Sequence, residues 1–428
     1  MMSNFMPAKS VSGGHPAAYP LQAVRALALN TQGLDIPLGQ EGPPTLGSIY
    51  RVVERLGCVQ IDTLQMVHRS QYLVLWSRLG HYKPGDFDRL IYDPQHRRLF
   101  EYWKHAASII PLAEYRYHLP MMRYYKEGHG VWWENWLHQP GNAELVEAVR
   151  QRIQKEGGVR ASDFVHDGGP RGTWWDWKPA KHALEHLYNT GELMIASRIN
   201  FQRIYDLRER VLPEWVDTTE PTVDERNRHR IEQAVRALGI CEPFQASEYA
   251  YLKRGTSKPY VEELIAEGVF VEVQAVLADG VARTLIVHRL NLPLLERAAA
   301  GDLPARRTTF LSPFDNLFWA RQRDELFWGF RNVLEAYKPA SDRIWGYYSI
   351  PVLHDDRFVG RFDPRLDRKS GTLYLKAIYL EPGVDPTEDL ASSIAATLRD
   401  FLEFHTATDL VVERSHPAEF GEKLLAFL

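Results

Sequence analysis

Gln60 and Asp62 are the side chains whose types and spacing most clearly suggest chemistry. They lie in the run GCVQID at 57–62, in which apolar and polar residues alternate as in a strand with one buried face. In a strand, their Cα atoms would be roughly 6.5–7 Å apart and their side chains would share a face. A water molecule fits between such groups. The amide can orient this water, and an ionised carboxylate can polarise it and stabilise a cation forming nearby.

A structural role fits the same two residues. Asp62 would then cap a helix that begins after Thr63, and Gln60 would be a polar residue at a strand edge. On spacing alone, this structural role is the commoner one, so the catalytic interpretation needs further support from the rest of the chain.

Length and composition define the broad class. The chain has 428 residues, which predicts two to four domains, and its 45% hydrophobic and 25% charged residues are ordinary for a soluble globular protein. Residues 1–18 are expected to form a loose tail. We expect a cytoplasmic protein, because no signal-peptide pattern and no apolar run of membrane-spanning length is found. Cys58 and Cys241 suggest neither a disulfide framework nor a metal site, and we expect no cofactor.

Charge is distributed unevenly around the formal net charge of −4. Between Gln60 and Tyr125 there are nine Lys or Arg against six Asp or Glu, whereas from Leu373 onward there are four against ten. This asymmetry places any phosphate-facing surface in the N-terminal two-thirds of the chain. The solvated faces of ordinary helices explain it almost as well.

A short pattern recurs along the chain. The segment AKHALEHLYNTGELMI at 180–195 predicts an amphipathic helix, a glycine stop and a strand, and KPYVEELIAEGVFVE at 258–272 repeats it at an offset of 77 residues. Pro179 and Pro259 stand close to the expected helix starts. Each helix is followed by two strand-like runs around a turn, and helices at about 161–166 and 246–253 precede it. Both copies therefore predict a winged helix, and residues 48–64 are a more divergent candidate for a third.

Tandem winged helices favour DNA as the partner, because the second helix of each unit can enter the major groove while the hairpin contacts the backbone. Protein-contact modules are the alternative. In the middle copy the candidate DNA contacts are basic side chains on the helix and hairpin: Lys178, Lys181, His182, His186, Arg198 and Arg203. In the last copy they are Lys253, Arg254 and Lys258.

The C-terminal part differs in character. Three antiparallel strands are expected around 344–352, 358–362 and 372–380, followed by a helix from about 386 to 405 with Asp385 as its cap. This predicts a small α+β or partly closed barrel module. The segment TFLSPFDNLFWARQ at 309–322 is aromatic and turn-rich, which suggests the interface that joins this module to the rest. A catalytic use of Asp315 is the less favoured alternative.

Three segments carry a resemblance to a known family. QIDTLQMVHRSQYLVLWSRLG at 60–80, FEYWKHAASIIP at 100–111 and LSPFDNLFWAR at 311–321 resemble the bacterial winged-helix DNA glycosylases that unhook interstrand crosslinks, the YcaQ/AlkX and AlkZ group. The resemblance spans nearly the whole chain. The family signature is Gln-x-Gln in one branch and Gln-x-Asp in the broader branch, and Gln60-Ile61-Asp62 matches the second.

The resemblance implies an α+β fold with three tandem winged-helix domains and a C-terminal β-barrel-like domain. We expect a tail at 1–18, a first winged-helix region with the catalytic motif at 19–160, a second at 161–225, a third at 226–300 and the C-terminal domain at 301–428.

The implied activity is a monofunctional DNA glycosylase acting on N7-alkylated purines, including crosslinks. Such a base already carries positive charge, so one carboxylate suffices where ordinary glycoside hydrolysis uses two. Asp62 would stabilise the sugar cation and polarise water, and Gln60 would hold that water. The motif contains no lysine that could form a Schiff base, so we expect base release without strand cleavage. We expect damaged double-stranded DNA as the partner, no membrane, no nucleotide cofactor and a monomer.

Residues beyond the motif would complete the site. His68, Arg69 and Arg78 would contact phosphates or the lesion, and Trp103 and His105 would form a wall near the sugar. A buried core position is the alternative for the tryptophan and the histidine. Two other functions remain open at this stage: a noncatalytic regulator that binds an operator, and an interaction module of a larger DNA-processing assembly.

Overall fold

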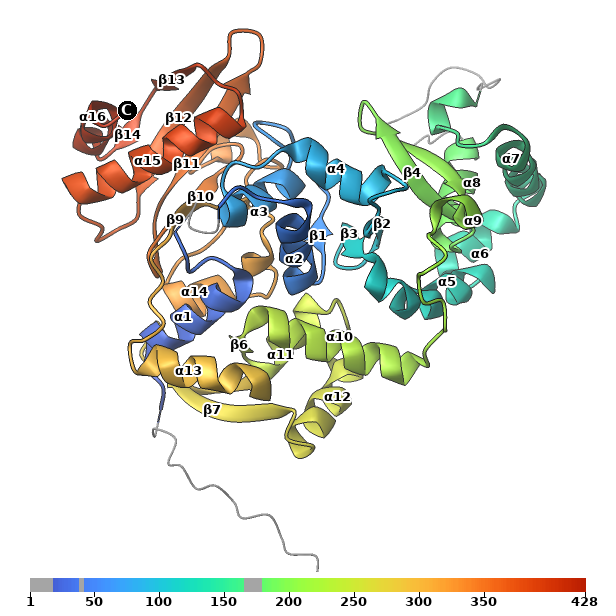
Figure 1. Ribbon diagram of the computed structural model, residues 1–428, viewed down its shortest axis with the longest axis horizontal. Helices are drawn as coiled ribbons and strands as arrows, with labels where there is room; N and C mark the ends of the chain where they lie inside the picture. Colours follow the sequence, from blue (N-terminus) through green and yellow to red (C-terminus); the bar gives the residue numbers. More distant parts are fainter. Residues whose placement is uncertain (1–17, 38–41, 165–178) are drawn as a thin grey trace, which may run out of the picture.

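The computed structural model describes residues 18–37, 42–164 and 179–428, and the protein has a mixed α+β fold with several small sheets. The elements between residues 46 and 111 lie in the middle of the molecule (Figure 1). The C-terminal elements flank them on one side, the elements from α7 to α9 on the other, and those from α10 to α13 below. No helix in these ranges has both the length and the apolar character needed to cross a membrane.

One order of elements recurs three times: a helix, a short strand, two helices and a hairpin. The first set is α2 (Leu46–Leu56), β1 (Val59–Gln60), α3 (Ser70–Leu79), α4 (Pro84–Tyr92), β2 (Leu99–Trp103) and β3 (Ala107–Pro111). The second is α7 (Asn142–Glu156), a single bridge at Val159, η2 (Ala161–Asp163), α8 (Pro179–Asn189), β4 (Leu193–Ile199) and β5 (Gln202–Leu207). The third is α10 (Val223–Leu238), β6 (Ile240–Cys241), α11 (Pro243–Tyr249), α12 (Arg254–Ala266), β7 (Phe270–Val276) and β8 (Ala282–His288).

Strand pairing is the same in all three sets. The short first strand pairs antiparallel with the last strand of its own hairpin, as the partners Val59↔Ile109, Val159↔Tyr205 and Ile240↔Val287 show. The helix, stop and hairpin predicted at 180–207 and 258–288 are confirmed, with Gly191 and Gly268 at φ 73° and 70° in the left-handed region that glycine favours.

Two sequence predictions about these repeats are wrong. Pro259 does not lie near a helix start, because α12 begins at Arg254 and contains this proline in its interior. Residues 48–64 are not a third copy of the helix-stop-hairpin segment. They contain the first helix and first strand of their set, and the hairpin lies some forty residues further on. A helix, a glycine and a strand also occur at the start of each set, as at α2, Gly57 and β1, so this pattern alone does not identify the hairpin segment.

The remaining helices connect these sets. They are α1 (Leu21–Gln32), η1 (Leu112–His118), α5 (Leu119–Lys126), α6 (Val131–Leu137), α9 (Arg208–Val211), η3 (Arg289–Asn291) and α13 (Leu292–Ala299). The apolar face of α1 packs with residues of the third hairpin and of the C-terminal part in one hydrophobic core.

The C-terminal part contains β9 (Thr308–Phe310), η4 (Asn316–Phe318), α14 (Arg323–Trp328), η5 (Ala340–Asp342), β10 (Ile350–His354), β11 (Arg357–Asp367), β12 (Thr372–Leu380), α15 (Glu388–Phe404), β13 (Asp409–Val412), β14 (Ser415–His416) and α16 (Ala418–Ala426). Its strands follow the order β13-β12-β11-β10-β9, and β14 also pairs with β12. This path has two free ends, so the sheet is open rather than a closed barrel. The helix cap is Thr387, which accepts a hydrogen bond from Leu390 N–H, and not Asp385.

The sheet β1-β3-β2 lies between two hydrophobic cores. Cys58 and Phe100 belong to the core shared with the second and third repeats. Val59 and Leu99 belong to the core shared with the C-terminal sheet and α15. The strand that carries Gln60 is therefore fixed from both faces. Apolar side chains of the second and third repeats pack on one face, and those of the C-terminal part pack on the other.

Candidate active site

Gln60 and Asp62 lie where β1 ends and a loop begins. Gln60 is opposite Ser108 on β3, and the next residue continues the pairing because Ile61 N–H donates to Ala107 O at 2.8 Å. Both Gln60 and Asp62 are partly exposed. The strand is shorter than expected, since it contains only Val59 and Gln60. The hydrophobic core still fixes the backbone of the motif, and the side chains of Gln60 and Asp62 reach solvent.

Asp62 closes a turn of the loop. Its Oδ1 accepts a hydrogen bond from Leu64 N–H at 2.7 Å, and its own N–H donates to Gln71 Oε1 at 3.4 Å. No helix follows at Thr63: residues 61–69 form a loop, and α3 begins at Ser70. Asp62 is therefore not a helix cap, and the structural role expected for it as the alternative to catalysis is wrong. Among the described residues, nothing hydrogen-bonds the Gln60 side chain, so its amide is available to a water or substrate.

The protonation of Asp62 is shifted by its surroundings. Burial raises the pKa of Asp62 above its usual value of 3.8, and this effect exceeds the opposing effects of the Leu64 N–H bond and the nearby Arg69 charge. A carboxylate with a raised pKa accepts a proton more readily than an exposed aspartate does. The Asp62 carboxylate is thus suited to take a proton from water while remaining a partner for positive charge.

The loop at 61–69 is held by the C-terminal module. Leu366 N–H donates to Met66 O at 2.8 Å, and Arg368 Nη2 donates to Val67 O at 2.6 Å. His68 N–H donates to His405 Nε2 at 3.2 Å. The loop that carries Asp62 therefore depends on a sheet and a helix some 300 residues further along the chain.

His68 does not have the phosphate-contacting role predicted for it. Its ring packs 4.9 Å from Phe404 and 5.0 Å from His405, between centroids, and burial lowers its pKa to about 4. A neutral, packed imidazole is a poor partner for an anion. We therefore reassign His68 to anchoring of the loop.

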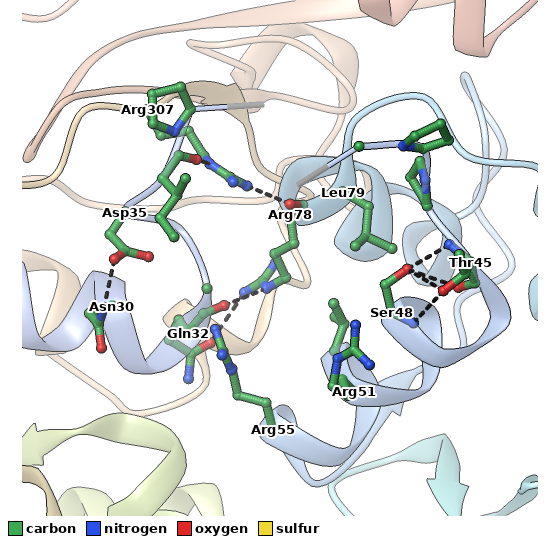
Figure 2. A pocket seen from close by; sticks show the side chains of 17 residues that line it. Asn30, Gln32, Asp35, Thr45, Ser48, Arg51, Arg55, Arg78, Leu79 and Arg307 are labelled. Carbon is green, nitrogen blue, oxygen red and sulfur yellow. Dashed lines mark hydrogen bonds between the residues drawn. The ribbon is translucent and has the colours of Figure 1, made fainter. Parts of the chain in front are cut away.

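Arg78 is likewise misassigned as a DNA contact. Its guanidinium donates to both oxygens of Asp315, with Nη1–Oδ2 at 2.6 Å and Nη2–Oδ1 at 2.9 Å. Its Nε also donates to Gln32 O at 2.8 Å (Figure 2). Both charged side chains are almost fully buried. The pair is structural, which also removes Asp315 from the catalytic alternatives, and the 309–322 segment is confirmed as an interface.

Arg198 and Arg203 are occupied by another buried carboxylate. Arg198 Nε and Nη2 each donate to Glu101 at 2.6 Å, and Arg203 lies 3.6 Å from the same carboxylate. These pairs join the second hairpin to β2, and contact of either guanidinium with DNA stays a prediction. Lys178 lies outside the described residues. Lys181 is on α8, where partial burial lowers its pKa, and its DNA contact stays a prediction.

Trp103 and His105, predicted to form a wall near the sugar, differ in their surroundings: Trp103 is exposed and His105 is stacked on another ring. Trp103 ends β2 with 42% of its surface exposed, and its Nε1 donates to Asn189 Oδ1 at 2.7 Å. His105 lies in the turn between β2 and β3 and stacks on Trp319, with centroids 4.2 Å apart and planes at 6°. Burial lowers the pKa of His105 to about 4, so this imidazole is neutral.

Tyr251, Trp319 and Phe201 are further residues of this region that sequence reasoning missed. The Tyr251 ring lies 5.6 Å from His105 and is 66% exposed, and its backbone has a φ of 54°. Only Trp319 had a sequence signal, since it belongs to the LSPFDNLFWAR segment. Tyr251 and Phe201 reach the site from other repeats, and nothing in their local sequence indicates this.

Gln60 and Asp62 line none of five cavities found within the described ranges. The motif therefore does not sit in any of these pockets. The cavity in Figure 2 lies instead at the opposite end of α3, beside Arg78 and Leu79. In the described part of the chain, no group of three or more His, Cys, Asp or Glu side chains is placed to hold a metal ion.

Comparison with known proteins places the chain in the class of DNA glycosylases. Residues 53–404 match the family described as DNA glycosylase AlkZ-like, and the protein belongs to this family. It is therefore a DNA-binding hydrolase of DNA repair. The solved structure of Streptomyces sahachiroi DNA glycosylase AlkZ is similar in fold, with a TM-score of 0.59 at 15% sequence identity, over 93% of this chain and 100% of that chain.

Proposed function

We propose that the protein hydrolyses the N-glycosidic bond of N7-alkylated purines in double-stranded DNA, including purines joined in interstrand crosslinks, with Asp62 and Gln60 as the catalytic residues. The observation that carries this proposal is the placement of these two side chains. Both are partly exposed, Gln60 at the end of a strand that lies between two cores and Asp62 two residues further on, at the start of the loop. The regulator and the interaction module are not retained, because the family is one of enzymes.

The reaction balances with these two groups. The bond between C1′ and N9 breaks, and its electron pair neutralises the cationic N7-alkylpurine, which leaves without a general acid. Asp62 stabilises the positive charge that develops on the sugar. Gln60 orients a water whose oxygen forms the new bond to C1′, and Asp62 accepts the proton that this water loses and passes it to solvent. The products are a free base and an abasic site with an unbroken strand.

The three repeated sets support the proposed mode of DNA binding. Each has the element order of a winged helix, so we propose three winged helices over residues 46–111, 142–207 and 223–288, followed by the C-terminal domain from 301. The boundaries expected at 160/161 and 225/226 are shifted, because they would separate α7 and the first turn of α10 from their own sets. A purine tethered to the opposite strand cannot be drawn fully into a closed pocket. The partial exposure of Gln60 and Asp62 supports an open site that a crosslinked duplex could approach.

The experiment is direct. Purified protein is incubated with a duplex that contains a single 7-methylguanine, and with a duplex crosslinked by a nitrogen mustard. We expect release of 7-methylguanine, separation of the crosslinked strands, and strand breaks only after alkaline treatment of the abasic product. Strand cleavage without alkali, or no base release from either duplex, would contradict the proposal.

A further inference from the structure

The tip of the β4–β5 hairpin reaches the loop that carries Asp62. Arg69, the last residue of this loop, has its guanidinium carbon 3.7 Å from the centre of the Phe201 ring. The guanidinium carbon of Arg198 lies 4.3 Å from the same ring. Phe201 thus contacts two cations, one from its own hairpin and one from the first repeat. Contacts of this kind are attractive because the ring face is electron-rich.

The backbone at this tip is unusual. Asn200 and Phe201 have φ angles of 49° and 66°, in the left-handed region that bulky residues rarely adopt. Two consecutive residues of this kind form the tight turns that suit hairpins, where glycine or asparagine is the usual occupant. The conformation is held by Arg198, whose Nη1 donates to Phe201 O at 2.7 Å. A phenylalanine is an unusual occupant of such a backbone position, which points to a role for its ring.

The Arg69 guanidinium packs on this ring and has little hydrogen bonding of its own. Its Nε is buried and has no hydrogen-bond partner among the described residues. The charged and titratable groups near Arg69 are Asp62, Tyr72, Arg198 and Arg368. Arg198 is neutralised by Glu101, and Arg368 donates to the Val67 carbonyl. Tyr337 and Tyr348 face Asp62 from the C-terminal part. Among all of these groups, Arg69 is the cation whose charge opposes the effect of burial on Asp62.

We propose that Phe201 is a positioning residue that holds the Arg69 guanidinium beside Asp62, so that the hairpin of the second repeat sets the charge around the catalytic carboxylate. This inference rests on the proposed function, because it assigns Asp62 to the reaction. It also gives the second hairpin a role besides DNA contact: docking of its tip completes the site in the first repeat.

The test measures single-turnover base release from a 7-methylguanine duplex as a function of pH, for wild type and for Phe201→Ala, Phe201→Tyr, Arg69→Met and Ile199→Ala. Ionised Asp62 is the active form, so activity falls as pH drops through its pKa. Loss of the Arg69 charge, or of its position, raises that pKa. We expect the acid midpoint of Phe201→Ala and Arg69→Met to move up by about 0.3–1 pH unit, a two- to tenfold loss of rate on the acid limb.

Two control variants distinguish an effect of the Phe201 ring from a general disturbance of the hairpin. Phe201→Tyr retains an aromatic face and should restore the wild-type midpoint. Ile199 is at the same tip, 51% exposed, and Ile199→Ala should leave the midpoint unchanged. Wild-type midpoints in both Phe201→Ala and Arg69→Met would overturn the inference, provided that their melting temperatures match wild type. If Asp62→Asn releases base at the wild-type rate, the proposed function itself fails, which is a different outcome.

Discussion

Arg78 and Asp315 form a buried, two-pronged ion pair between residues 237 positions apart, with both side chains almost fully excluded from solvent. Arg78 is near the end of α3, the helix that follows the Asp62 loop, and Asp315 precedes η4 at the start of the C-terminal part. Ser70 at the other end of α3 bonds Ser312 at 2.8 Å. The helix that follows the Asp62 loop is thus fixed to the C-terminal part at both ends.

Removal of the Asp315 carboxylate should destabilise the protein strongly. Asp315→Ala leaves the Arg78 charge buried without its partner, which typically costs about 3–5 kcal/mol. The double variant Arg78→Met/Asp315→Leu removes both charges and should recover much of this loss. Denaturant unfolding followed by far-UV circular dichroism checks both. A change of less than about 1 kcal/mol for the single variant would mean that water reaches the pair.

Tyr251 is expected to contribute to DNA binding. Its ring is largely exposed, continues the His105–Trp319 stack and projects from the turn between α11 and α12. Stacking of a nucleobase on an aromatic side chain is worth about 1–3 kcal/mol. Tyr251→Ala should therefore weaken binding of a lesion-containing duplex about fivefold or more, as measured by fluorescence anisotropy at fixed salt, while Tyr251→Phe should bind like wild type.

Tyr124 on α5 provides the matched control for Tyr251. It is also a partly exposed tyrosine, and its ring contacts are with Tyr125 and His129, outside the region around the motif. Tyr124→Ala should leave the affinity unchanged. Equal weakening by Tyr124→Ala and Tyr251→Ala would indicate a nonspecific loss of aromatic surface and not a stacking site.

Asp62 should lower the stability of the protein at neutral pH. Its pKa is raised on folding, so its contribution to stability is fully present below the pKa of the unfolded chain and is lost as pH rises through the folded value. Asp62→Asn keeps an acceptor for Leu64 N–H but carries no charge. At pH 7 the variant should melt about 1–2 °C above wild type, and the difference should shrink towards pH 4.5. If Asp62→Asn is less stable than wild type at pH 7, burial is not the dominant effect on the pKa of Asp62.

The sequence identifies the parts of this fold that depend on local pattern. Alternation at 57–62 locates the strand end with Gln60 and Asp62, and the helix periodicity with glycine stops locates two hairpins. It does not identify partners. A basic side chain such as Arg78 or Arg198 has the same local signature whether it faces a phosphate or a buried carboxylate, and here the carboxylates are about 100 or more positions away. Phe201 and Tyr251 were missed because only tertiary docking brings them to the site.

The role of the Asp62 carboxylate is tested most directly by single-turnover release of 7-methylguanine from a defined duplex by wild type, Asp62→Asn and Asp88→Asn. Asp88 on α4 is the matched control, because it is also a partly buried carboxylate with a raised pKa. Unlike Asp62, it accepts a hydrogen bond from the Tyr72 hydroxyl, at 2.8 Å. We expect Asp62→Asn to bind the duplex as wild type does but to release base at least about 100-fold more slowly, while Asp88→Asn stays close to wild type. Equal rates of base release by wild type and Asp62→Asn would show that the Asp62 carboxylate is not catalytic.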